Sequence, residues 1–187
     1  MRKALLAVVL VLFAASPALA QNPIELGADL GFWYSSTGKI GETEFVDVTT
    51  IALPVAFRAG FFLNDNISIE PSAGVYWYKE SDDGTEISFM TFLADVLYHF
   101  NTSGDTQFFV HGGGGINVVK GGEGGESESN LQFGFDGGAG VKFPIVERLF
   151  FRLGGRVLYL LENDKDEFPR ASSFNIIGTL GLSMMTM

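Results

Sequence analysis

Hydrophobic and polar residues alternate with a period of two along most of the chain beyond residue 23, a spacing typical of β-strands. The clearest run is LQFGFDGGAGVKF at 131–143, where one face is apolar or glycine and the other reads Gln, Gly, Asp, Gly, Gly, Lys. The pattern predicts eight strands, which we place at 24–34, 48–60, 67–78, 87–100, 106–119, 131–143, 149–161 and 172–185.

The connections between these strands alternate in length. Long polar connections are expected at 35–47, 79–86, 120–130 and 162–171, and short ones at 61–66, 101–105 and 144–148. This order predicts an up-and-down antiparallel meander with both ends of the chain on the side of the short turns. Membrane β-barrels have the same asymmetry, with short turns on one side and longer loops on the other.

The distribution of charge indicates that the apolar face of the strands meets lipid. The chain is 47% hydrophobic and only 18% charged. The strand segments carry five acidic and four basic residues, whereas the four long connections carry 14 acidic and five basic residues. Sparse, nearly balanced charges fit a narrow interior in which buried ions pair. The sequence therefore predicts an all-β, eight-stranded antiparallel up-and-down transmembrane β-barrel whose lumen is filled by side chains.

The charged residues on the polar faces form the candidate site, a lumen polar network. Its predicted members are Glu25, Asp29, Arg58, Glu70, Asp95, His111, Asp136, Lys142, Arg152 and Arg156. If the turn at 144–148 is symmetric, Asp136 lies opposite Arg156 and Gly140 lies opposite Arg152, with the glycine leaving room for the long side chain. The same reasoning at 101–105 places Asp95 opposite His111.

Two features interrupt the strand pattern. Pro54 and Pro71 fall inside predicted strands, where a proline removes one donor from the hydrogen-bond ladder. We expect β-bulges at these positions. The glycine run HGGGG at 111–115 favours strands weakly, and we interpret it as space for bulky neighbours in the interior.

The N-terminus has the three parts of a secretory signal peptide: Arg2 and Lys3, an apolar run at 4–15, and the small-residue pattern Ala18-Leu19-Ala20. Cleavage is expected between Ala20 and Gln21. The sequence thus predicts a signal peptide at 1–20 and one barrel domain at 21–187. No cysteine is present, so an exported protein of this kind is held together without disulfides.

The sequence contains only weak motifs for a catalytic, cofactor or metal site. The only histidines are His99 and His111, and a general base oriented by Asp95 is one interpretation, against a hydrogen-bond network in the interior. The segment GGEGGESES at 121–129 resembles one imperfect copy of a calcium-binding repeat, which works only by repetition. The sequence predicts no catalytic residues, no cofactor and no metal site. A net charge of −10 argues against nucleic acid as a partner.

Two other function classes stay open. Gly31-Phe32-Trp33 matches the G-x-W of lipocalins, which are exported eight-stranded barrels with an apolar interior. A soluble carrier of an apolar ligand is therefore one alternative, and a lipid-modifying membrane enzyme is the other. The acidic connections suit divalent cations or a basic partner, or serve only solubility and protection against strand pairing.

The stretch LQFGFDGGAGVKFPIVERLFFRLGGRVLYLL at 131–161 resembles the last hairpin region of small outer-membrane β-barrel proteins of the OmpA/OmpX-like type. The resemblance rests on F-G-x-x-G-G-A-G-V at 133–141, a short turn, and an apolar strand with the inward arginines Arg152 and Arg156. The final residue, Met187, departs from the aromatic residue that usually ends such barrels.

This resemblance implies a Gram-negative outer membrane, surrounding lipid and lipopolysaccharide, and insertion by the barrel-assembly machinery. From the strand order and the charge of the connections, we expect a monomer whose four acidic loops face the outside, where an unidentified extracellular partner is one candidate for them. The resemblance carries over no specific activity, because the family includes structural proteins, adhesins, resistance factors and a few enzymes. A structural or adhesin-like surface role, without enzymatic activity, is expected instead from the filled lumen and the acidic loops.

Overall fold

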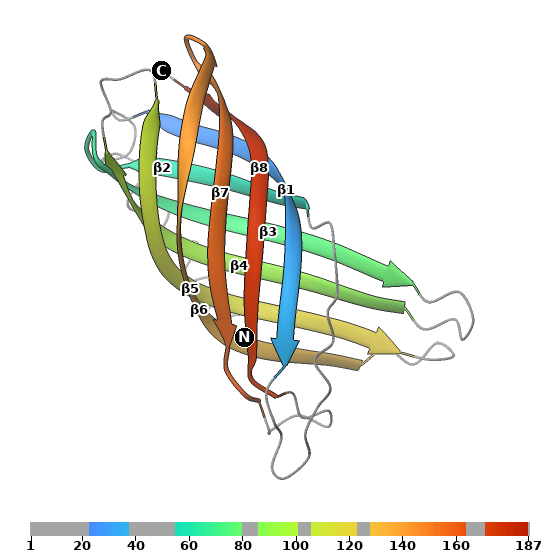
Figure 1. Cartoon of the computed structure of the whole chain (residues 1–187). Coiled ribbons are helices and arrows are strands. Elements are labelled where there is room, and N and C mark those ends of the chain that lie inside the picture. Colours follow the sequence, from blue (N-terminus) through green and yellow to red (C-terminus); the bar gives the residue numbers. More distant parts are fainter. Residues whose placement is uncertain are drawn as a thin grey trace, which may run out of the picture.

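The computed structural model describes residues 23–37, 55–79, 86–100, 106–122, 128–163 and 171–186. Eight antiparallel strands close into one barrel in chain order (Figure 1). They are β1 Ile24–Thr37, β2 Val55–Phe62, β3 Ile67–Lys79, β4 Glu86–Phe100, β5 Gln107–Gly122, β6 Glu128–Val146, β7 Leu149–Leu160 and β8 Ser173–Met185. β1 pairs with both β2 and β8, so the sheet has no open edge.

The predicted strand number, order and meander are confirmed, and most strand boundaries agree within three residues. The period of two was sufficient because one face of each strand points outward with mostly apolar side chains, while the other points into the lumen and holds the buried polar side chains together with some apolar ones. The expected signal peptide at 1–20, with its cleavage site at Ala20 and Gln21, lies outside the described residues. So do most of the four long connections and Pro54. Among the described residues, no helix has the length and hydropathy to cross a membrane.

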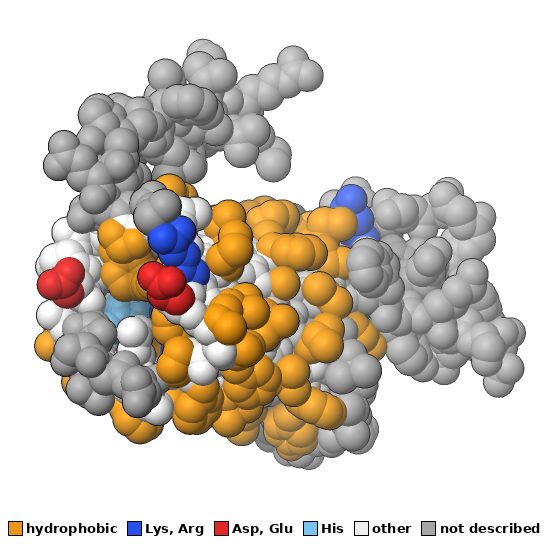
Figure 2. All heavy atoms as spheres, turned by 90° about the horizontal axis from the view of Figure 1, so that it is seen from above, with side chains coloured by type: hydrophobic (Ala, Val, Ile, Leu, Met, Phe, Trp, Pro, Cys, Tyr) orange, Lys and Arg blue, Asp and Glu red, His pale blue; other side chains and the backbone are white. Residues whose placement is uncertain are grey.

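The barrel has its apolar side chains outside and its ions inside. Phe57, Phe133 and Phe135 are 63–65% exposed, whereas Glu25 and Lys142 are 1% exposed. Figure 2 shows hydrophobic side chains covering the visible flank of the barrel. A soluble protein would reverse this distribution, because exposed apolar surface in water is unfavourable. The flank therefore has the surface of a protein that is solvated by acyl chains.

Pro71 does not produce the expected bulge, so that expectation is wrong. Strands β2 and β3 keep one register on both sides of it, with Arg58 opposite Ser72 and Phe61 opposite Ile69. The paired residues stop between these two positions, while Pro71 itself pairs with Ala94 of β4. The backbone N–H that Pro71 lacks is thus accommodated by a short interruption of the β2–β3 ladder, without a shift of register. A register shift occurs instead near the β6–β7 turn, between Pro144 and Val146.

Candidate functional site

Six charged side chains fill the lumen near the short turns. Their alternating positions on five strands point them inward, and three acids balance three bases. We call this set the six-charge cluster: Glu25 and Asp29 of β1, Arg58 of β2, Glu70 of β3, Lys142 of β6 and Arg152 of β7.

Arg58 is the centre of one half of the six-charge cluster. Its Nε donates to Asp29 Oδ2 at 2.8 Å and its Nη1 donates to Glu25 Oε1 at 2.9 Å. The same Nη1 lies 3.5 Å from Glu70 Oε2. A Cβ atom at Gly27, which pairs with Arg58, would lie 2.6 Å from this Nη1. The glycine therefore gives the guanidinium the space it needs to lie across the lumen.

The other half of the cluster connects opposite walls of the barrel. Arg152 donates two hydrogen bonds to Glu70, with N···O distances of 2.7 and 3.0 Å, and Lys142 Nζ donates to Glu25 Oε2. The Phe109 ring lies 4.2 Å from Arg152 Cζ and 5.6 Å from Lys142 Nζ, measured to the ring centroid. These cation–π contacts and ion pairs together compensate two cations that are buried in the lumen.

His99 belongs to a separate, fully buried pair. Its Nε2 lies 2.8 Å from Ser68 Oγ, and its ring stacks on Phe62 with centroids 4.9 Å apart. Both His99 and Ser68 are 1% exposed. A serine hydroxyl beside a histidine is a nucleophile–base arrangement in open sites, whereas here both side chains are buried. Asp95 lies beside the other histidine, so the interpretation of Asp95 as an orienting acid does not apply to His99.

A second charged group lies farther along the lumen, on four consecutive strands. It consists of Asp95 of β4, His111 of β5, Asp136 of β6 and Arg156 of β7, which we call the four-residue cluster. Arg156 Nη2 donates to Asp95 Oδ2 at 2.9 Å, and its Nη1 lies 3.5 Å from Asp136 Oδ2. His111 Nδ1 lies 3.6 Å from Asp95 Oδ2 and 3.4 Å from Asp136 Oδ2.

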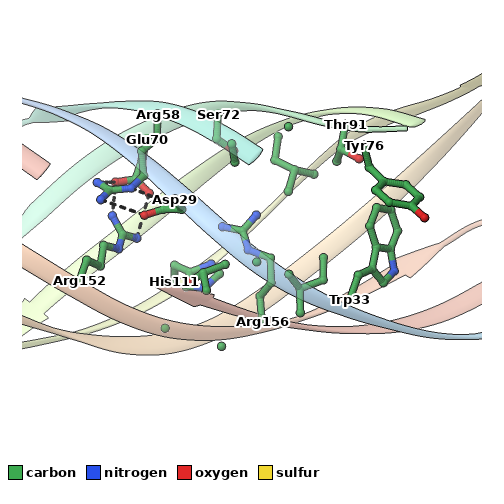
Figure 3. Close-up of a pocket in the computed structure, with 18 of the residues that line it drawn as sticks. Asp29, Trp33, Arg58, Glu70, Ser72, Tyr76, Thr91, His111, Arg152 and Arg156 are labelled. Atoms are coloured by element: carbon green, nitrogen blue, oxygen red, sulfur yellow. Dashed lines mark hydrogen bonds and ion pairs between the residues drawn. The ribbon is translucent and has the colours of Figure 1, made fainter. Parts of the chain in front are cut away.

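A cavity of about 80 Å³ separates parts of the two clusters. Small side chains such as Ser72 and Gly154 make the space, because they cannot fill the lumen. In Figure 3 four members of the six-charge cluster, Asp29, Arg58, Glu70 and Arg152, lie at one end of the cavity, with Trp33 and Tyr76 at the other end and Arg156 between them. At roughly 10–15 Å³ for each enclosed water, this volume has room for about five to eight waters.

Neutral polar side chains tie the strands together beyond the cavity. Trp33 Nε1 donates to Asn175 Oδ1 at 2.8 Å, from β1 to β8. Gln132 donates from one amide nitrogen to the carbonyl oxygens of Leu161 and Ala171, both at 3.0 Å. The inward glutamine thus holds the two ends of the 162–171 connection, which begins and ends on neighbouring strands.

The predicted register was wrong by two residues at both turns. Arg156 pairs with Gly138 rather than Asp136, and His111 pairs with Leu97 rather than Asp95. The assumption of a symmetric turn failed at β6–β7, where the strands continue to Val146 and Leu149 and the ladder is irregular. An even shift keeps the same faces inward. The expected Asp136–Arg156 contact is therefore present as a diagonal ion pair.

All ten residues of the predicted network lie on the inward face, and the structure divides them between the two clusters. The predicted network left out the neutral polar residues of the lumen, and it did not include His99. Those that are nearly fully buried include Ser68, His99, Asn117, Gln132 and Asn175. Their place in the alternation was the available signal, because each falls on the face of its strand that alternates with the apolar, outward residues.

A family model for the outer membrane protein beta-barrel domain matches residues 5–177 of the chain. The chain belongs to this family. It is accordingly an outer-membrane protein of Gram-negative cells, in agreement with the apolar flank. A lipocalin-like carrier requires an apolar interior, so the buried ions of the lumen exclude that alternative.

One curated relative is outer membrane porin F of Pseudomonas fluorescens, with 32% identity over 120 residues. The match covers 59% of this chain and 36% of porin F, so the chain spans about a third of that relative. Among solved structures, Neisserial surface protein A has a TM-score of 0.69 at 16% identity, with 86% of this chain and 96% of that chain covered.

The attachment invasion locus protein Ail of Yersinia pestis, in complex with the heparin analogue sucrose octasulfate, has a TM-score of 0.57 at 14% identity. Here 88% of this chain and 99% of Ail are covered. At these identities the two structures show the shared barrel fold alone.

Proposed function

We propose that this outer-membrane barrel is closed to general diffusion and serves as a rigid support for its four long acidic connections at the cell surface. The observation that carries the proposal is the six-charge cluster. Lys142 and Arg152, from β6 and β7, reach Glu25 and Glu70 on β1 and β3. These contacts cross the lumen, so the side chains block the axis along which a solute would pass.

Opening this barrier is costly. A solute the size of a sugar must displace cations that are ion-paired and packed against Phe109. Removing one partner of a buried ion pair costs about 3–5 kcal/mol, because the other charge is left without compensation. The barrel therefore supports a structural or adhesin-like role better than that of a porin.

The charge of the connections limits the choice of partner. The long connections carry 14 acidic and five basic residues. A polyanion such as the heparin analogue bound by Ail would be repelled by them. The extracellular partner that fits is a basic protein surface, approached by electrostatic attraction.

The remaining partners are those of the membrane itself. Lipid and lipopolysaccharide surround the apolar flank, and the barrel-assembly machinery inserts the chain. Closure of the sheet within one chain supports a monomer, since all eight strands find their neighbours internally. No catalytic step is part of the proposal, because the Ser68–His99 pair is buried.

Conductance across a planar lipid bilayer tests the closed lumen. The purified protein is expected to give no steps on the scale of a general porin, which is measured in the same bilayer as a positive control. Stable porin-sized steps would contradict a side-chain-filled lumen.

Attachment of cells tests the surface role. The chain is displayed on a laboratory Gram-negative strain, and its attachment to cultured epithelial cells is compared with that of a variant in which Asp and Glu of 79–86 and 162–171 become Asn and Gln. The matched control is Glu147→Gln in a short turn. Several-fold weaker attachment by the loop variant alone is expected, and equal attachment by all three would overturn an adhesive role.

A further inference from the structure

The four-residue cluster differs from the six-charge cluster in its balance of charge. It contains two carboxylates, Asp95 and Asp136, but one guanidinium, that of Arg156. Both carboxylate side chains are at most 1% exposed. With a neutral His111 imidazole, the form that binds a metal, the buried cluster has one positive charge fewer than it has negative charges. Such a site favours a cation, because an unpaired buried ion is unfavourable.

Several atoms of this cluster also lack hydrogen bonds. In the part of the chain that the structure describes, these are Asp95 Oδ1, His111 Nδ1 and both carboxylate oxygens of Asp136. The Asp136 side chain is 0% exposed and the His111 side chain is 4% exposed. Buried polar atoms of this kind are rare in native proteins and often mark the place of an ion or a water.

The spacing of these atoms fits metal coordination. His111 Nδ1 lies 3.4 Å from Asp136 Oδ2 and 3.6 Å from Asp95 Oδ2, and one ligand atom from each residue lies within 4.8 Å of the others. Two ligands at 2.0–2.1 Å from a tetrahedral zinc ion are about 3.3–3.4 Å apart. Both separations are long for good hydrogen bonds. The 3.4 Å separation matches the edge of such a coordination shell, and the 3.6 Å separation exceeds it slightly.

We propose that Asp95, His111 and Asp136 form a lumen site for one divalent transition-metal cation of the zinc type. One imidazole nitrogen with two carboxylate oxygens suits zinc and its neighbours, whereas magnesium and calcium prefer oxygen ligands alone. The cation takes the place of the Arg156 guanidinium, which contacts the same two carboxylates.

The surroundings leave room for this exchange. The Arg156 side chain is 15% exposed, and Arg156 and His111 both line the cavity (Figure 3). The guanidinium can therefore withdraw into the cavity when a cation enters. Two glycines frame the ligands: a Cβ at Gly113 would meet Asp95 Oδ1, and one at Gly138 would lie 2.5 Å from His111 Nε2.

Calorimetry with zinc and visible spectroscopy with cobalt test the site on the tag-free protein in detergent micelles. With two histidines and no cysteine in the chain, few alternative nitrogen or sulfur ligands exist. We expect one zinc ion for each barrel and a cobalt spectrum of low coordination number. His111→Gln and Asp136→Asn should weaken zinc binding at least about tenfold. His99→Gln, the matched control, should leave it unchanged.

Arg156→Gln distinguishes replacement of the guanidinium from simple addition of a metal. It removes the competing cation, so we expect tighter zinc binding than in the parent chain. Folding of each variant is checked by the heat-dependent shift in gel mobility. Folded His111→Gln that binds zinc as the parent does, or a parent chain without stoichiometric binding, would overturn the site. Weaker binding by Arg156→Gln would overturn the exchange.

Discussion

Arg152 and Glu70 form a two-pronged ion pair between strands that are not neighbours, with N···O distances of 2.7 and 3.0 Å. Arg152 belongs to β7, between β6 and β8, and Glu70 belongs to β3, between β2 and β4. Two parallel hydrogen bonds between charged groups fix distance and orientation together. The pair therefore ties opposite walls of the barrel, in addition to the backbone ladder that joins adjacent strands.

Glu70→Ala should lower the free energy of unfolding by about 3–5 kcal/mol, because Arg152 and Arg58 lose a shared buried counter-charge. Urea unfolding in lipid vesicles measures the change. Glu147→Ala, in the exposed β6–β7 turn, is the matched control and should stay within about 0.5 kcal/mol of the parent. A loss for Glu70→Ala no larger than for this control would show that the ion pairs are dispensable.

Gly27→Ala should destabilise the barrel by about 1–3 kcal/mol, because the added methyl group would overlap the Arg58 guanidinium. Gly178→Ala is the matched control, since a Cβ there has no atom within 4 Å. Thermal unfolding followed by circular dichroism compares the two variants. Equal midpoints would mean that Arg58 has an alternative position of similar energy.

Much of the fold could be predicted because lipid imposes a simple rule on each strand. Phe133 and Phe135 had to lie on one face and Asp136 on the other, and this holds whatever the register. The inward direction of the nine charged residues and His111 followed from the same parity. The long connections are acidic, whereas the charges of the strands nearly balance. This contrast indicated that the apolar face of the strands meets lipid and that the polar face points into the lumen.

The pairs within the lumen could not be predicted in the same way. Lys142 reaches Glu25 across the barrel, and no local pattern connects residues so far apart in the chain. The register between β6 and β7 depends on an irregularity of the ladder between Pro144 and Val146. The assumption of a symmetric turn does not include this irregularity. The partner of His99 is Ser68 on β3 and not an acidic residue. Which residue lies beside His99 depends on the register between β3 and β4, and the sequence pattern does not give that register.

Phe135→Arg should lower stability by about 2–4 kcal/mol, because this side chain is 64% exposed on the lipid face near the middle of β6. Phe143→Arg, near the short turn of the same strand, should cost no more than about 1 kcal/mol, since a guanidinium there reaches the interface. Unfolding in vesicles measures both. A larger loss at 143 than at 135 would place the bilayer centre elsewhere along the strand.

Asn175→Leu should destabilise the barrel by about 1–3 kcal/mol, because it leaves the Trp33 indole N–H and the Leu158 carbonyl without their buried partner. Ser173→Ala removes one hydrogen bond to the same amide and should have a smaller effect. A Trp77→Phe background leaves Trp33 as the only tryptophan of the chain, so its fluorescence during urea unfolding reports on this position directly. Loss of the Asn175 acceptor should also shift the emission of the folded protein. An unchanged spectrum together with unchanged stability would mean that the indole finds another acceptor at the end of the cavity, and that the β1–β8 closure does not depend on this contact.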